Sequence, residues 1–136
     1  MKTGLNEFFR YNLWANLRLL EACSKLSDEQ LDMKIEGVYG SIRETLVHML
    51  TSEEGYAHRF TFSGSKLLPM LKDFTTFPGF DELRQRAEHS GKELIAVSEL
   101  ARLDEVLHLD GGTYDAQLII ILIQAINHGV DHRSQI

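Results

Sequence analysis

Apolar residues recur at helical spacing in the first half of the chain. Over residues 5–25 they stand three or four positions apart, which predicts a helix with one wide apolar face. A second such stretch follows Ser41 and continues to about Phe62; Ser41 and Glu44 have the spacing of a capping box at its start. Only Glu53 interrupts its apolar stripe. Both stretches are therefore expected to form amphipathic helices.

Two further helices are expected in the second half. Residues 63–79 contain both prolines, which favours a long connection over a continued helix. A third amphipathic helix is expected over residues 81–101, and residues 103–112 can form a short extended segment. Thr113 is placed to cap a last helix, with an acidic residue, Asp115, in its first turn. Because that helical pattern is still running at the last residue, we expect the native helix to continue beyond it.

Four long helices without a convincing strand predict an all-α fold, a four-helix bundle with long connections. A length of 136 residues suits one compact domain, so residues 1–136 are expected to form a single domain, truncated at its C-terminus. The longest apolar run, residues 118–126, is too short to span a bilayer. It carries apolar residues on almost every side, more than one bundle face would cover, so a homodimer is expected.

Composition and charge narrow the range of partners. The chain is 43% hydrophobic and 25% charged, which is ordinary for a globular protein. Its net charge is -6 and its basic residues are scattered, which opposes nucleic-acid binding. The single cysteine, Cys23, has no internal partner for a disulfide, and the N-terminus lacks the apolar core of a signal peptide. A reducing, cytoplasmic setting without a membrane anchor is expected.

The last predicted helix carries a pair of histidines suited to a metal ion. His128 and His132 are four residues apart, so their side chains lie on one face of the helix and can chelate one ion. Helical projection places a third histidine, His48, away from the apolar stripe of its own helix. That position argues against a core-filling role for His48. It does not distinguish a histidine that lines a site from one that faces bulk water.

Three segments of the chain carry a resemblance to a known family. They read FFRYNLWANLRLLEACSKLSDEQL, GSIRETLVHMLTSEE and INHGVDHRSQI, and they follow one another in the family's order over almost the whole chain. Together they resemble the DinB/YfiT-like metalloenzyme family, whose members are four-helix bundles. In that family one histidine of the second helix and two of a C-terminal H-x-x-x-H pair hold a divalent metal, commonly nickel or zinc. The resemblance assigns these roles to His48, His128 and His132.

The resemblance also suggests a chemistry. Three protein ligands leave a coordination position open, as in catalytic metal sites, and some relatives are thiol-dependent S-transferases or isomerases. We therefore expect one divalent metal per chain and, as the leading hypothesis, a transferase that joins a low-molecular-weight thiol to a small-molecule substrate. A metal-dependent hydrolase and a non-enzymatic, stress-related metal-binding homodimer stay open as alternatives.

Other polar residues near the three histidines are candidates for a supporting role. Groups that accept the second N–H of an imidazole orient it for metal binding. The candidates for this role, chosen by position in helical projection, are Glu44, Gln124, Asp131 and Gln135. The family pattern does not involve the remaining histidines, which are expected at the surface: His58, His89 and His108.

Overall fold

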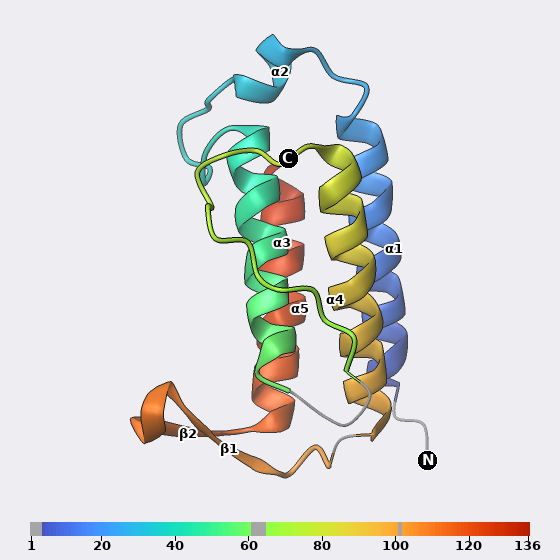
Figure 1. Ribbon diagram of the computed structural model, residues 1–136, viewed down its shortest axis with the longest axis vertical. Helices are drawn as coiled ribbons and strands as arrows, with labels where there is room; N and C mark the ends of the chain where they lie inside the picture. Colours follow the sequence, from blue (N-terminus) through green and yellow to red (C-terminus); the bar gives the residue numbers. More distant parts are fainter. Residues whose placement is uncertain (1–3, 61–64, 101) are drawn as a thin grey trace.

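Four long helices lie side by side along the longest axis of the molecule (Figure 1). The structure, a computed structural model, describes residues 4–60, 65–100 and 102–136. The long helices are α1 (Leu5–Cys23), α3 (Ile42–His58), α4 (Phe80–Leu100) and α5 (Leu118–Gln135). The smaller elements are helix α2 (Asp28–Asp32), strands β1 (Val106–Leu109) and β2 (Tyr114–Gln117), and the 3₁₀ turn η1 (Asp110–Gly112). The predicted four-helix bundle is confirmed.

Each long helix packs mainly against two others in the bundle. Helix α1 packs against α4 and α5, and α3 packs against the same two helices. Helices α1 and α5 run in one direction, whereas α3 and α4 run in the other (Figure 1). Because α3 and α4 are parallel, the chain between them has to return along the length of the bundle. This requirement explains the long connection predicted around the two prolines. No helix within the described ranges is long and apolar enough to cross a membrane.

The start of the last helix was wrongly predicted. Helix α5 begins at Leu118, and Thr113 does not cap it. The residues before it form β2, which pairs antiparallel with β1 in a hairpin that places Asp115 opposite His108. The turn of this hairpin has positive φ at Asp110, Gly111 and Gly112, and glycine adopts such a conformation at little cost. The extended segment expected within residues 103–112 contains β1, and its pairing with β2 adds one small hairpin to the predicted helical bundle.

The end of the second long helix also differs from the prediction. Helix α3 ends at His58 with Arg59 as its C-cap, rather than near Phe62, which lies outside the described residues. The Arg59 and Phe60 N–H groups bond to carbonyls three residues back, so the helix tightens and closes there. The side chain of Phe60 is buried in the core below.

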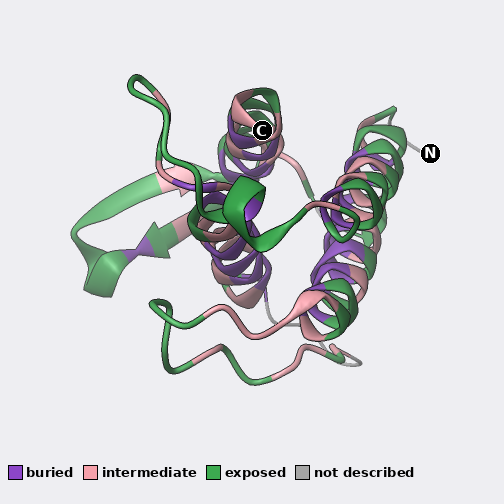
Figure 2. Ribbon diagram, turned by 90° about the horizontal axis from the view of Figure 1, so that it is seen from above, coloured by how far each residue is buried: buried purple, intermediate pink, exposed green. Residues whose placement is uncertain are grey.

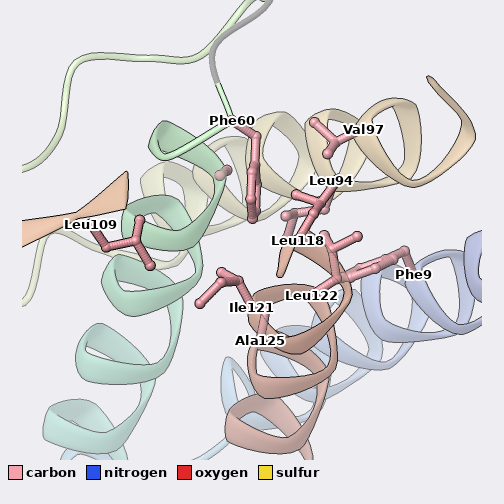
Figure 3. Close-up of a cluster of buried hydrophobic side chains, with 10 residues drawn as sticks. Phe9, Phe60, Leu94, Val97, Leu109, Leu118, Ile121, Leu122 and Ala125 are labelled. Carbon is pink, nitrogen blue, oxygen red and sulfur yellow. The ribbon is translucent and has the colours of Figure 1, made fainter. Parts of the chain in front are cut away.

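Two apolar clusters fill the interior of the bundle. The cluster toward the hairpin, drawn in Figure 3, consists of Phe9, Ala57, Phe60, Leu94, Val97, Leu109, Leu118, Ile121, Leu122 and Ala125. The cluster toward the opposite end consists of Leu20, Cys23, Leu31, Leu46, Met49, Leu50, Leu83 and Ala87. Seen along the bundle, the buried residues line the facing sides of the helices (Figure 2). Burial of this apolar surface, at about 25 cal/mol per Å², is the main force that holds the four helices together.

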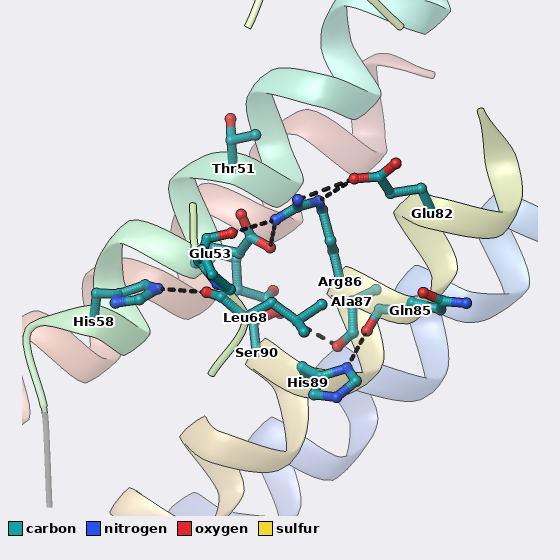
Figure 4. Close-up of polar contacts among 12 residues, drawn as sticks. Thr51, Glu53, His58, Leu68, Glu82, Gln85, Arg86, Ala87, His89 and Ser90 are labelled. Carbon is teal, nitrogen blue, oxygen red and sulfur yellow. Dashed lines mark hydrogen bonds and ion pairs between the residues drawn. The ribbon is translucent and has the colours of Figure 1, made fainter. Parts of the chain in front are cut away.

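Polar contacts hold the long connection against the outside of α3 and α4. Arg86 donates to the carboxylate of Glu54 and to the carbonyl oxygen of Pro69, both at 3.0 Å. A ring nitrogen of His58 lies 3.1 Å from the carbonyl oxygen of Leu68 (Figure 4). The connection is thus fixed at two successive residues: Leu68 is bonded to α3 and Pro69 to α4.

The start of α3 depends on a capping box, as the sequence predicted. The Ser41 side chain accepts from the Glu44 N–H, and the Glu44 carboxylate accepts from the Ser41 N–H at 2.8 Å. We expect Ser41→Ala to lower the free energy of unfolding by about 1 kcal/mol in urea denaturation, because the first turn loses a partner for a backbone donor. Ser24→Ala is the matched control, since Ser24 is exposed and bonds only within its own turn. An equal loss in both variants would contradict the prediction.

Candidate metal centre

Three histidines from two helices meet on one side of the bundle. His48 lies on α3, and His128 and His132 lie one turn apart on α5. Their nearest ring nitrogens all lie within 4.8 Å of one another, and Nε2 of His48 is 3.2 Å from Nε2 of His128. Two nitrogens bound to one zinc ion at about 2.0–2.1 Å in a tetrahedron lie about 3.3 Å apart. The spacing of the His48 and His128 nitrogens therefore fits a shared metal ion.

Gln135 fixes the orientation of the third histidine. Nδ1 of His132 lies 3.1 Å from the side-chain oxygen of Gln135, which also accepts from the backbone N–H of Tyr39 at 3.4 Å. An amide oxygen can only accept, so Nδ1 of His132 carries the proton and donates it. The lone pair of His132 then lies on Nε2, the nitrogen left for a metal.

The ring of Tyr39 covers the histidines from the loop before α3. It stacks on His48 with the ring centroids 4.1 Å apart and the planes at 15°, and it meets His132 edge-on at 5.4 Å. On the other side, Tyr56 meets the ring of His128 edge-on at 6.0 Å. These aromatic contacts restrict the rotation of all three imidazoles. The site is therefore largely arranged before any ligand enters.

Burial and mutual repulsion keep two of the imidazoles neutral. Burial and, to a lesser extent, repulsion by positive charge on His132 and His48 together lower the pKa of His128 to about 4. Burial also lowers the pKa of His48, again with a contribution from His132. A neutral imidazole has a free lone pair, which is the form that binds a metal. At neutral pH neither ring has to lose a positive charge before it binds a metal.

An open cleft begins at His48. Its volume is about 1110 Å³, and it lies between the loop before α3, the outer side of α3 and the long connection. Its apolar walls include Tyr39, Met70 and Phe74. Charged groups at its edge are paired, for example Lys34 with Glu44 at 2.9 Å. The cleft thus offers an apolar surface for a small molecule beside the histidines.

The family model that matches this chain covers residues 1–136 and describes the DinB family. The chain belongs to the DinB family. The resemblance found in the three sequence segments is thereby confirmed over the full length. A curated relative, Protein DinB of Bacillus subtilis (strain 168), is 24% identical over 140 residues, an alignment that covers 96% of this chain and 80% of the relative. No solved structure matches the chain.

In this DinB-family chain, one of the four supporting candidates forms a hydrogen bond with a histidine of the cluster. That residue is Gln135. Asp131 is exposed and lies 3.5 Å from the Gln135 amide nitrogen, and its charge opposes the lowering of the His128 pKa. Glu44 is used in the capping box and in its ion pair, and Gln124 is exposed on α5.

The other histidines of the DinB-family chain lie away from the cluster. His89 bonds to a carbonyl of its own helix, and exposed His108 pairs with Asp115 across the hairpin. His58 is partly buried and contacts the long connection, so it is not a simple surface residue.

Sequence reasoning missed Tyr39. It stands in a loop among glycine and other irregular residues, where no periodic pattern assigns a direction to a side chain. Tyr39 is nine positions before His48 in the sequence, and this spacing does not predict that the two side chains meet. Only the folded loop brings its ring over the imidazoles. The nearby Y-G-S-I-R segment would suggest a helix start and nothing about a metal.

The acid sensitivity of the metal-free protein tests the state of His128. A folded pKa of about 4 lies below the unfolded value of about 6.5. Because the unfolded chain takes up a proton at His128 more readily than the folded protein does, the free energy of unfolding falls as the pH drops from about 6.5 to about 4. Above about pH 6.5 His128 is neutral in both states and this loss is absent. In urea denaturation with EDTA, the wild type should lose more stability over this range than His128→Gln. The exposed control His89→Gln should behave as the wild type, and equal losses in all three would contradict the assignment.

The stacking of Tyr39 should contribute to metal affinity. Aromatic pairs of this kind contribute about 0.5–1.5 kcal/mol, which corresponds to roughly a 2- to 12-fold change in a dissociation constant. We expect Tyr39→Ala to raise the dissociation constant for zinc by such a factor, whereas Tyr39→Phe keeps the ring and should bind as the wild type. Competition with a chromophoric chelator measures both. Equal affinity of the alanine variant would show that the ring does not hold His48 in place.

Proposed function

We propose that this chain holds one divalent metal ion through His48, His128 and His132. The observation that carries the proposal is the convergence of three imidazoles from α3 and α5. One ring nitrogen from each lies within 4.8 Å of the other two. Gln135 supports the proposal because its side-chain oxygen bonds to Nδ1 of His132, which leaves Nε2 of His132 for the metal. Imidazole binds both nickel and zinc well, and we propose these two as the metals that the site accepts.

We further propose that the site serves thiol transfer to a small molecule. When bound, a divalent metal with three protein ligands would lower the pKa of a thiol at its open position. The cleft beside His48 would receive the acceptor, and its apolar walls and paired charges favour an uncharged, apolar electrophile. In the overall reaction the thiol sulfur forms a bond to the electrophilic carbon. The bond from that carbon to its leaving group breaks, and the leaving group departs with the thiol proton.

A screen of thiols tests this function. Metal-loaded, untagged protein is mixed with each of several low-molecular-weight thiols and with 1-chloro-2,4-dinitrobenzene, and formation of the thioether is followed by absorbance. We expect a rate above the uncatalysed one that needs both thiol and metal and is lost in His128→Ala. Turnover of ester substrates that needs metal but no thiol would favour a hydrolase instead. A fully metal-loaded protein without either activity would leave metal binding as the function.

We also propose that the chain forms a homodimer through the outer face of α5. Three apolar side chains on one face of α5 are 43–53% exposed: Ile120, Ile123 and Val130. A second copy would remove them from water in a symmetric contact. Sedimentation velocity at micromolar concentration should show a dimer, and Ile123→Asp should give a monomer. Leu100→Asp, an exposed apolar site at the end of α4, is the control. A monomeric wild type would contradict the proposal.

A further inference from the structure

A layer of polar side chains separates the two apolar clusters of the core. Asn12 and Asn16 come from α1, Glu53 from α3 and Ser90 from α4, and each is at most 4% exposed. Arg133 of α5 completes the layer. All four long helices therefore contribute to it. Glu53, which interrupts the apolar stripe predicted for this helix, lies at the centre of the layer and bonds to Asn12, Asn16 and Ser90.

The hydrogen bonds of this layer run in one direction. Arg133 Nη1 donates to the side-chain oxygens of Asn12 and Asn16, both at 2.7 Å. Both asparagines then donate from their amide nitrogens to Oε2 of Glu53, at 2.8 and 2.9 Å. A guanidinium has only donors, so each asparagine has to turn its oxygen to Arg133 and its nitrogen to Glu53. The two asparagines thus form a relay between the cation of α5 and the carboxyl group of α3.

The fourth helix closes the layer from the other side. Ser90 donates to Oε1 of Glu53 at 2.9 Å, as the stick view in Figure 4 places it. Burial raises the pKa of Glu53, and the three side-chain hydrogen bonds and the charge of Arg133 oppose that rise. Both carboxyl oxygens of Glu53 are thereby engaged. A shift of any one helix along its axis would break at least one of these bonds.

Gly129 leaves the space that the relay occupies. A Cβ atom at this position would lie 2.8 Å from Oδ1 of Asn12 and 2.9 Å from Nη1 of Arg133. Both distances are shorter than real Cβ contacts, so both side chains would have to move. Glycine in the middle of a helix costs about 1 kcal/mol relative to alanine. The relay gives a physical reason for that glycine on the helix of His128 and His132.

A relay of this kind is a poor way to gain stability. Replacement of a buried ionic network by well-packed apolar residues is often neutral or stabilising by about 1–4 kcal/mol. Apolar contacts tolerate small shifts between helices, whereas hydrogen bonds at 2.7–2.9 Å do not. The relay joins α3, five residues after His48, to α5 at the residue after His132. It therefore fixes the two helices whose histidines have to meet.

We propose that the Arg133–Asn12/Asn16–Glu53 relay is a positioning device that sets α5 against α3 so that His48 meets His128 and His132 at metal-binding distance. This role rests on the proposed metal site. The side-chain hydrogen bonds of the relay residues run to one another and to Ser90, and none of them goes to His48, His128 or His132. They act through the placement of the two helices, with α1 as the bridge between them.

An apolar replacement of the relay separates positioning from stability. The variant carries Asn12→Leu, Asn16→Leu, Glu53→Met and Arg133→Met, so no charged member of the relay stays without a partner. We expect its free energy of unfolding to equal or exceed that of the wild type. Its dissociation constant for zinc should rise by about 10- to 100-fold, as for other groups that orient metal ligands. The visible absorption bands of bound Co²⁺ should shift and weaken, because the ligand geometry changes.

Two further variants make the test specific. Glu53→Gln can still accept from both asparagines, and its amide can donate to Ser90, so metal affinity and the Co²⁺ spectrum should return to nearly wild-type values. Glu54→Met with Arg86→Met removes a second buried ion pair, which joins α3 to α4 and does not reach α5. This control should bind zinc as the wild type does.

The outcomes distinguish the relay from the metal site itself. A folded apolar variant with wild-type zinc affinity and an unchanged Co²⁺ spectrum would overturn the positioning role. If that variant does not fold, Gly129→Ala gives the same test, since it displaces the relay without removing a polar group, and wild-type zinc affinity there would overturn the role equally. A wild-type protein that takes up no zinc would instead overturn the metal site, and with it the reason for the relay.

Discussion

His128→Ala is expected to raise the dissociation constant for zinc by about a hundredfold. Structural zinc sites with four ligands bind with about 10–16 kcal/mol, so one ligand contributes about 3 kcal/mol. Nε2 of His128 lies 3.2 Å from Nε2 of His48, so the substitution removes one of two nitrogens that are spaced for a shared metal ion. Competition with a chromophoric chelator at pH 7.5 gives the dissociation constant directly.

The matched control is His89→Ala. His89 is an exposed histidine on α4 that bonds to a carbonyl of its own helix. The His89→Ala substitution should leave zinc affinity within about twofold of the wild type. Circular dichroism should show that both alanine variants are folded. If the two alanine variants bound zinc equally well, the site would have to be elsewhere in the chain.

Glu53→Ala is expected to lower the free energy of unfolding by about 3–5 kcal/mol, the usual cost when one partner of a buried ionic network is removed. The carboxyl group accepts from the side chains of Asn12, Asn16 and Ser90, and all three donors would be left buried without it. Arg133 would also lose its counter-charge. The midpoint and slope of urea unfolding measure the loss.

Two control variants show whether this loss is specific to the buried carboxyl group. Glu21→Ala removes an exposed carboxylate that pairs with Arg18 and Lys25, and surface pairs of this kind contribute only about 0–1 kcal/mol. Glu53→Gln keeps the acceptor for both asparagines and should lose much less stability than Glu53→Ala. An alanine variant at Glu53 as stable as the wild type would show that the polar layer is not tightly bonded.

The helices and the bundle were predictable because they depend on local periodicity. Apolar spacing gave the long helices, and the S-x-x-E pattern gave the first residue of α3. The pairing of His128 with His132 also follows from spacing on one helix. His48 is different, because its partners are 80 or more positions away and only the resemblance connected it to them.

The rest of the site depends on contacts between distant segments. An extended segment was expected where β1 lies, but its partner β2 was missed because it is short and Thr113 and Asp115 suit a helix start equally well. The polar layer was missed because each member, viewed alone, is one polar residue on an amphipathic helix. Asn12 and Asn16 are four positions apart on the buried face of α1, and Glu53 interrupts an apolar stripe. Such polar residues at core positions are the sequence signal that could have indicated the layer.

The metal content of untagged protein tests the central claim most directly. The protein is incubated with equimolar nickel and zinc, dialysed, and measured by inductively coupled plasma mass spectrometry against its concentration. Three converging imidazoles predict about one metal ion per chain in the wild type and in His89→Ala, and a large loss in His128→Ala. Wild-type protein that retains no nickel or zinc, or a His128→Ala variant that retains as much as the wild type, would contradict the account.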